Sequence, residues 1–312
     1  MNAIETKTAT DFAAELRGDV IAIELHRSSI GRSRSMSRRH KDEVADHFAA
    51  SRKSVSSSKK LFPPNQPQIK AINSILGDAR RVWEYLTIGY TKKGVRLIRK
   101  DQLDWFIQEF DELEVRLAEA LNQADEQYDE IMDNSREWLQ DRLFDPNDYP
   151  ASFAGSVSLR WSVHNFEPSE ELLQLAPETY AREQLRVRQQ FESAIIAYED
   201  ECRSQMADLI GSLLYALRSE KDGKRQIFKE ATANNLRDFF QRFKSMGITS
   251  DASLAELIAE AEDALGGTTM RTLKNSSVAR NGIASAFKDV AQKLNTLIVD
   301  APTRSISLDE LE

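Results

Sequence analysis

DQLDWFIQEFDELEVRLAEALNQADEQYDEIMDNSREWLQDRL, residues 101–143, is the stretch that decides the fold. It contains no Gly or Pro. Apolar or small residues recur every seven positions at Leu103, Phe110, Leu117, Ala124, Ile131 and Trp138, with Phe106, Leu113 and Ala120 at the intermediate position. This spacing predicts one coiled-coil-like helix, roughly 60 Å long at a rise of 1.5 Å per residue. The Asp- and Pro-rich segment 145–150 ends it.

A second long helix is expected over residues 178–219, which also lack Gly and Pro. Apolar residues recur there every three or four positions at Phe191, Ile195, Tyr198, Cys202, Met206, Leu209, Leu213 and Leu217. The two long helices are similar in length and are separated by a strand and Pro breaks. The sequence therefore predicts that they pack antiparallel as a helical hairpin.

Three short segments carry strand signals. Residues 20–25 (VIAIEL) form a β-branched run, residues 95–99 follow a Gly turn and alternate, and residues 157–163 alternate Val, Leu, Trp and Val with polar residues. Alternation with a period of two is typical of half-buried strands. The expected fold is mostly α (α+β), a long hairpin with a small β-sheet and C-terminal helices.

The remaining segments give four domains in the predicted organisation. Residues 1–60 hold a helix (4–17), the first strand and a basic Ser/Arg-rich arm that a short helix at 41–50 interrupts. Residues 61–220 hold the hairpin and sheet, including a helix from Gln68 to Leu86. Residues 221–300 are a helical region, with helices expected at 224–246, 251–266 and 269–298. Residues 301–312 are an acidic tail. Gly and Pro positions and Ser/Asp caps set these boundaries.

Composition narrows the class of protein. Of 312 residues, 41% are hydrophobic, which suffices for a core, yet no run approaches the roughly 18 apolar residues that span a bilayer. The N-terminus lacks the basic-then-apolar order of a signal peptide. The single Cys202 cannot form an internal disulfide, and its helical context predicts a small buried side chain. A cytoplasmic protein is expected.

Charge is segregated along the chain. Residues 27–60 contain ten Lys/Arg and three Asp/Glu, a net charge of +7, whereas the whole chain carries −8, which leaves −15 elsewhere. A flexible basic arm that binds nucleic-acid phosphates is one interpretation. The other two are a solvated loop and docking onto acidic helices of another copy. The candidate phosphate contacts are Arg32, Arg34, Arg38, Arg39, Lys41, Arg52 and Lys53.

No catalytic or metal-binding motif is present in the sequence. His26, His40, His47 and His164 lack metal-ligand spacing, and no phosphate loop, dinucleotide fingerprint or nucleophile elbow occurs. Asp145, Asn147 and Asp148 predict a turn rather than a cation loop. The abundant carboxylates of 111–130 predict a solvated helix face. We therefore expect no enzyme activity, no cofactor and no metal.

Four passages carry a family resemblance: VIAIELHRSSIGRSR (20–34), WEYLTIGYTKKGVRLIRKDQLDWF (83–106), REWLQDRLFDPNDYP (136–150) and SVSLRWSVHNFEP (156–168). They resemble a helical domain family of unknown function in bacterial, phage and plasmid proteins, often encoded near MoxR-like AAA+ ATPases. The resemblance implies a helical fold with a small β element, no defined reaction, and an ATPase or another mobile-element product as partner. It transfers no site residues.

These observations favour a non-enzymatic interaction or assembly protein that acts with a protein partner or with itself. A nucleic-acid-binding accessory protein that uses the basic arm is the alternative. The C-terminal SISLDELE, residues 305–312, mixes apolar and acidic residues as short docking peptides do, although an ordinary tail has the same composition.

Overall fold

The computed structural model describes residues 18–165, 168–217, 220–221, 224–225, 230–266, 272–273 and 276–299. Helices make up 69% of the structure, so the expected mostly α class with a small antiparallel sheet is confirmed. The expected helix at 4–17 and the tail at 301–312 lie outside the described residues.

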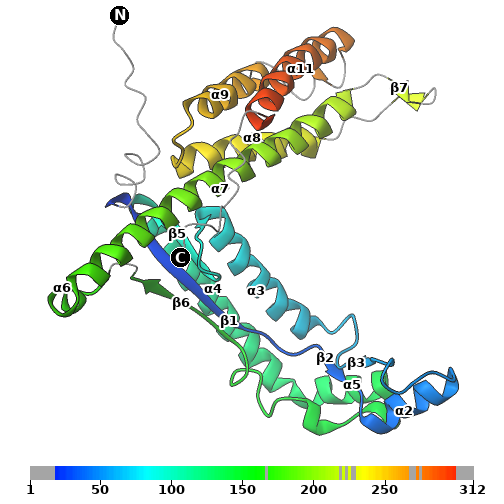
Figure 1. The fold of residues 1–312 in the computed structure, drawn as a ribbon. Coiled ribbons are helices and arrows are strands. Elements are labelled where there is room, and N and C mark those ends of the chain that lie inside the picture. The colour runs from blue at the N-terminus through cyan, green and yellow to red at the C-terminus, as the bar shows by residue number, and fades with distance from the viewer. Residues whose placement is uncertain are drawn as a thin grey trace, which may run out of the picture. The chain divides into compact units, whose positions relative to one another are not determined.

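Contacts divide the chain into two compact units, each assembled from segments far apart in sequence (Figure 1). The α4 unit comprises Ala22–Leu86 and Lys100–His164, and the α7 unit comprises Met1–Ile21, Thr87–Arg99 and Asn165–Glu312. None of the described helices combines the length and apolar character that crossing a bilayer requires.

The α4 unit is built on an antiparallel pair of helices. Helix α3 (Pro67–Leu86) lies beside α4 (Leu103–Glu126), which follows the short 3-10 helix η1 (Lys100–Gln102) (Figure 1). The Gln68 side chain donates to Gln127, and Arg116 pairs with Asp78 at 3.6 Å, so the beginning of α3 lies beside the end of α4. The seven-residue pattern is used here, since α4 buries Phe106, Phe110, Leu113, Leu117, Leu121 and Ala124.

The long helix predicted over 101–143 is interrupted at Gln127. There φ is −104° and ψ is 21°, and α5 (Tyr128–Leu143) begins at the next residue. Beyond the break, buried residues advance by fours through Ile131, Ser135 and Leu139, whereas Trp138 is 47% exposed. The prediction that Trp138 continues the apolar stripe was wrong, because after Ile131 the buried positions follow at intervals of four, at Ser135 and Leu139, and Trp138 lies beside this stripe.

The two long helices of the predicted hairpin belong to different units, and each has packing partners inside its own unit. Helix α4 packs on α3, and α7 (Pro177–Leu217) packs on α8 (Glu230–Met246) and α11 (Ser277–Val299). Helix α3 buries apolar residues along one side and packs on α4. The hairpin prediction did not consider α3 as the packing partner of α4.

Strands β1 (Val20–Ser28) and β6 (Ser158–His164) form an antiparallel ladder from Ala22↔His164 to Ser28↔Ser158 in the α4 unit. The alternation predicted for β6 is only partly used for burial. Leu159 is buried and the Trp161 ring contacts the Phe106 ring edge-on at 5.4 Å, but Val163 is exposed.

Asp125, near the end of α4, holds the loop that leads into β6. Its carboxylate accepts hydrogen bonds from the Ser152 hydroxyl at 2.7 Å and from the amides of Phe153 and Ala154 at 2.6 and 3.1 Å. Burial alone would raise the pKa of Asp125, but these three donors outweigh it and lower the pKa below the usual 3.8. The fold is therefore stabilised by the charged form.

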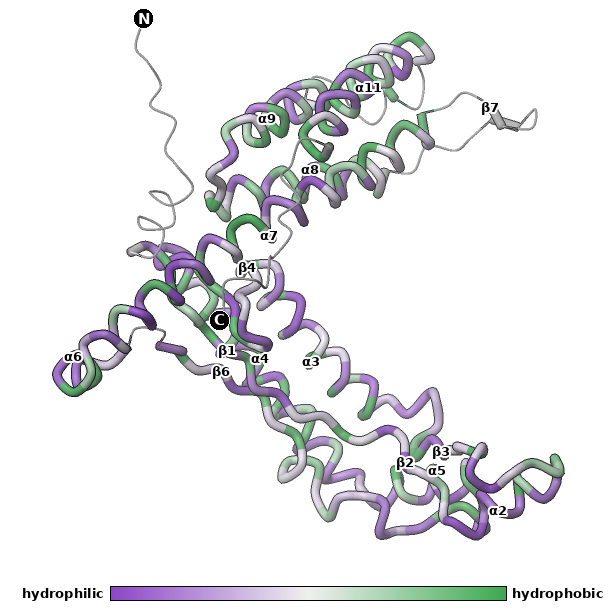
Figure 2. The backbone as a smooth tube through the Cα atoms, viewed as in Figure 1, coloured by the Kyte–Doolittle hydropathy of each residue, from purple (hydrophilic) through white to green (hydrophobic). Residues whose placement is uncertain are grey.

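The α7 unit consists of α6 (Glu170–Leu175), the 41-residue α7, α8, α9 (Ala252–Gly266) and α11. Apolar and polar residues alternate along these helices, as expected of amphipathic segments (Figure 2). The hairpin of β4 (Ile88–Gly89) and β5 (Val95–Arg99) also belongs to this unit, where β4 packs against α7.

One predicted helix boundary in the α7 unit changes. Lys224 does not begin a helix, because β7 (Glu220–Lys221) pairs with β8 (Lys224–Arg225) and α8 starts at Glu230. The intervening Asp-Gly is a sequence typical of two-residue hairpin turns. Of the last helix, expected over 269–298, the structure describes residues 272–273 as helical and α11 from Ser277, and the start at Thr269 lies outside the described residues.

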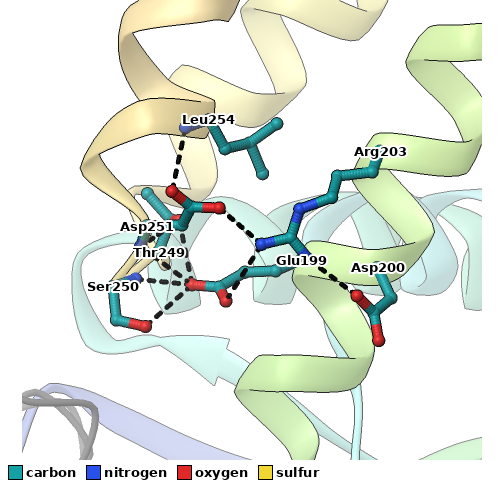
Figure 3. Close-up of polar contacts among 7 residues, drawn as sticks. All are labelled: Glu199, Asp200, Arg203, Thr249, Ser250, Asp251 and Leu254. Carbon is teal, nitrogen blue, oxygen red and sulfur yellow. Dashed lines mark hydrogen bonds and ion pairs between the residues drawn. The ribbon is translucent and has the colours of Figure 1, made fainter. Parts of the chain in front are cut away.

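A buried carboxylate fixes the turn between α8 and α9 (Figure 3). Glu199 on α7 is only 5% exposed and accepts from the Thr249 and Ser250 hydroxyls at 3.0 Å and from the Ser250 and Asp251 amides at 2.6 and 3.1 Å. Asp251 caps α9 by accepting from the Leu254 amide at 3.0 Å, and Arg203 pairs with Asp251. The bonds of Glu199 and Arg203 tie α7 to the turn between α8 and α9, and the Asp251–Leu254 bond caps α9, so the cluster is structural.

We predict that Asp125→Asn destabilises the chain by about 2 kcal/mol at pH 7, since hydrogen bonds to a charged acceptor contribute about 1.5–3 kcal/mol. A lowered folded-state pKa gives stability that is present above the unfolded pKa and is lost as pH falls through the folded pKa. The difference from the wild type should therefore shrink below about pH 4. Urea unfolding at pH 7 and pH 3 measures it, with the exposed Asp129→Asn as control. A constant difference at both pH values contradicts the argument.

Glu199→Ala should destabilise the α7 unit by about 3 kcal/mol or more, because the turn amides and Arg203 then lose a buried charged partner. Glu201→Ala, an exposed carboxylate two positions away, is the matched control and should change little. Thermal unfolding followed by circular dichroism compares the two. Equal melting temperatures would show that the buried cluster is dispensable.

Candidate interaction site

The basic segment predicted to be largely mobile is folded in the α4 unit. It forms β2 (Ser33–Ser35), α2 (Arg38–His47) and β3 (Ser58–Lys60), with β2 and β3 antiparallel from Ser33↔Lys60 to Ser35↔Ser58. This pairing was not predicted, because both strands are only three residues long and consist of Ser, Arg and Lys. The expected arm thus contains regular secondary structure.

Helix α2 begins earlier than the predicted residue 41 because Ser37 caps it. The Ser37 hydroxyl accepts from the His40 amide at 3.3 Å and contacts the His40 ring nitrogen Nδ1 at 2.9 Å. A Ser at this position satisfies an amide that would otherwise lack a partner in the first turn. Helix α2 is thus a regular element with a defined face.

Lys59 joins this folded segment to the end of α5. Its ammonium group donates to the Leu143 carbonyl and pairs with Asp148, both at 2.5 Å, and its side chain is only 11% exposed. Arg142 adds a second link to α2 through Glu43 at 3.0 Å. Two segments about 85 residues apart in sequence are thereby held together.

A largely apolar groove of about 340 Å³ lies between α2 and α5, and we call it the α2–α5 groove. Its lining residues are Met36, His40, Glu43, Val44, His47, Phe48, Leu139, Arg142 and Leu143. Phe48 is 72% exposed and stacks edge-on against the His47 ring at 4.9 Å. A large exposed aromatic residue beside an apolar groove is typical of a contact surface.

The structure places the seven candidate phosphate contacts on this folded segment, and they differ in whether another side chain contacts them. Arg39 pairs with Glu43 at 3.4 Å, and Arg52 approaches Asp42 at 3.7 Å and Asp46 at 4.0 Å. Lys41 donates to Ser35 at 2.6 Å. Within the part of the chain that the structure describes, the other four, Arg32, Arg34, Arg38 and Lys53, make no ion pair and are exposed.

The outward side of α4 carries the opposite charge. The acidic face, as we call it, consists of Asp111, Glu112, Glu114, Val115 and Glu119, all exposed. Val115 is 58% exposed, and Glu112 and Glu119 lie one turn before and one turn after it. Desolvation of the carboxylate by neighbouring atoms and the nearby Asp111 charge raise the pKa of Glu114. The expected solvated carboxylate face is present, with an apolar residue at its centre.

No group of His, Cys, Asp and Glu able to hold a metal ion occurs among the described residues. The predicted turn at 145–148 is confirmed, because the Asp145 carboxylate accepts from the Asn147 amide at 3.0 Å and begins a 3-10 turn, η2 (Pro146–Asp148). Cys202 is buried, as predicted, and burial raises the pKa of its thiol to about 11.

Comparisons of the chain with protein-family models, curated proteins and solved structures find no match. Sequence reasoning identified the basic segment and the acidic helix, but it missed the apolar groove. The available signal was Phe48, a large aromatic residue in the helix expected at 41–50. From the sequence alone we would have expected this helix to bury it, whereas the structure places it at the groove.

We predict that Cys202 reacts with a thiol reagent such as DTNB at least about 100-fold more slowly in the folded chain at pH 8 than in urea, because a thiol of pKa about 11 is almost wholly protonated and is also buried. The rate of absorbance change at both conditions measures the ratio. Similar rates would mean that the residue is accessible in the native state.

Proposed function

We propose that this chain is a non-enzymatic assembly protein whose copies join head to tail, the α2–α5 groove of one copy receiving the acidic face of the next. The observation that carries this proposal is that one unit presents two different surfaces that complement each other. The groove is apolar with cations nearby, and the face is apolar with carboxylates around it.

The apolar contribution comes from Phe48 and Val115. Their exposed fractions of 72% and 58% place them among the most exposed large hydrophobic residues of the described chain. Full burial of a side chain of this kind contributes about 1.5–3 kcal/mol. An interface that covers both would gain enough to offset part of the entropy lost on association.

The electrostatic contribution follows from the charges of the two segments. Residues 27–60 carry +7, and α4, residues 103–126, which holds the acidic face, has eight acidic residues and one basic residue and carries −7. Arg38, which makes no ion pair in the described part of the chain, adjoins Ser37 at the start of α2. Complementary charges of this size steer association and make it sensitive to salt.

The contact uses a different surface on each copy, so it is heterologous rather than two-fold symmetric. Each added copy leaves one groove and one face open, and the assembly therefore grows into a ring or a filament. A non-catalytic role agrees with the absence of recognisable catalytic motifs in the sequence.

Two variants test the direction of this contact. Phe48→Asp disrupts binding by the groove and leaves the acidic face unchanged. Glu112→Lys/Glu119→Lys disrupts binding by the acidic face and leaves the groove unchanged. Each alone should remain at the mass of one 35.4-kDa chain, while an equimolar mixture should form a species of two chains and no more. Light scattering coupled to size exclusion, at low and high salt, measures the masses.

Glu126→Lys/Glu130→Lys, with the same charge change on exposed positions further along, is the control and should assemble as the wild type does. Wild-type chains that stay single at every concentration in low salt would overturn self-assembly. Normal assembly of the face variant together with loss in the groove variant would indicate a symmetric groove-to-groove contact and would overturn the head-to-tail arrangement.

A further inference from the structure

A second hollow of the α4 unit lies between the two-stranded β2–β3 sheet and the first half of α3. It has a volume of about 540 Å³, within the range of about 300–1,000 Å³ that is usual for small-ligand sites. Three cationic side chains line it, Arg32, Lys60 and Lys70, together with the polar Ser33, Asn73 and Ser74. We call it the basic groove, and it is lined by none of the residues that line the α2–α5 groove.

The backbone brings these cations together. Ser33 on β2 pairs with Lys60 on β3, and the Leu61 amide donates to the Arg32 carbonyl at 2.9 Å. Arg32 and Lys60 therefore lie at the same end of the two-stranded sheet. Lys70 lies in the first turn of α3, where its amide donates to the Gln66 carbonyl at 3.1 Å. Lys60 on β3, Lys70 on α3 and Arg32, which directly precedes β2, therefore each contribute one cation to the groove.

These cations lack the carboxylates that their neighbours have. Lys59, Arg39 and Arg52 each lie within 4.0 Å of an Asp or Glu. Among the described residues, Arg32 and Lys60 make no side-chain ion pair, and Lys70 donates only to the neutral Asn65 carboxamide, at 3.2 Å. A site with three like charges and no internal counterion favours an external anion.

The chemistry of the lining favours phosphate. A guanidinium group binds two phosphate oxygens at once, an ammonium group adds a point charge, and the Ser33 and Ser74 hydroxyls can donate to further oxygens. The 20-residue helix α3 also directs its positive N-terminal end toward this part of the unit. Each contribution suits a tetrahedral oxyanion better than a single carboxylate.

We infer that the basic groove is a binding site for phosphate groups, carried either on a nucleic-acid strand or on a free phosphate compound. This site goes beyond the assembly proposed above and uses different side chains. It also revises the phosphate contacts expected from the sequence: of those seven residues only Arg32 lines the groove, and Lys60 and Lys70 were not among them.

The test compares two full-length double variants that each lose two positive charges. Arg32→Gln/Lys60→Gln removes groove cations, and Arg38→Gln/Lys53→Gln removes exposed cations of the same segment outside the groove. Fluorescence anisotropy with a labelled mixed-sequence 20-nucleotide single-stranded DNA measures affinity at about 50 mM salt, where phosphate contacts are strong. The groove variant should bind about tenfold or more weakly, and the control less than about threefold.

Equal loss in both variants would show diffuse attraction and overturn the site, as would a wild-type chain that binds neither the DNA nor pyrophosphate. Calorimetry with pyrophosphate separates the two sources of phosphate: binding of DNA alone identifies a strand, and groove-dependent binding of pyrophosphate alone identifies a free phosphate compound. Repeating both in the Phe48→Asp background separates this result from self-assembly, because Phe48 does not line the basic groove.

Discussion

The ammonium group of Lys59 is the contact on which the candidate surfaces depend. The last turn of a helix leaves carbonyl groups without partners, and Lys59 donates to one of them, at Leu143, while Asp148 balances its charge. This contact holds β3 at the end of α5. Because β3 pairs with β2, and α2 lies between them in sequence, the same contact places α2 against α5 and creates the groove between them.

The elements that could be predicted are those whose local pattern coincides with their burial. The stripe of α4 and the long α7 were foreseen because Phe106, Phe110 and Leu113, or Phe191 and Ile195, repeat at helical spacing and are buried. The folding of 27–60 could not be predicted, because its stability comes from contacts across about 85 residues rather than from propensity. The pairing of helices was equally non-local: an apolar stripe identifies a buried face without identifying its partner.

The candidate site was predictable in its charge and unpredictable in its geometry. Counting residues located the positive segment and the acidic helix, since net charge needs no structure. It did not show which cations are neutralised by the fold. Arg39 and Arg52 were indistinguishable from Arg32 in the sequence, yet α2 places Glu43, Asp42 and Asp46 beside the first two. Proximity in the fold thus decides which cations are available to an external partner.

Strand alternation explains how the three-residue strand β3 both anchors residues 27–60 to α5 and supplies a cation to the basic groove. Successive side chains of a strand point to opposite faces, so adjacent lysines have different surroundings. Lys59 faces Asp148 and the end of α5, whereas Lys60 lines the basic groove. A shift of β3 by one residue would exchange the positions of Lys59 and Lys60. Asp148 would then lose its partner, and the basic groove would lose one of its cations. The Lys59 anchor therefore sets the register of β3, and the register selects which cation faces the basic groove.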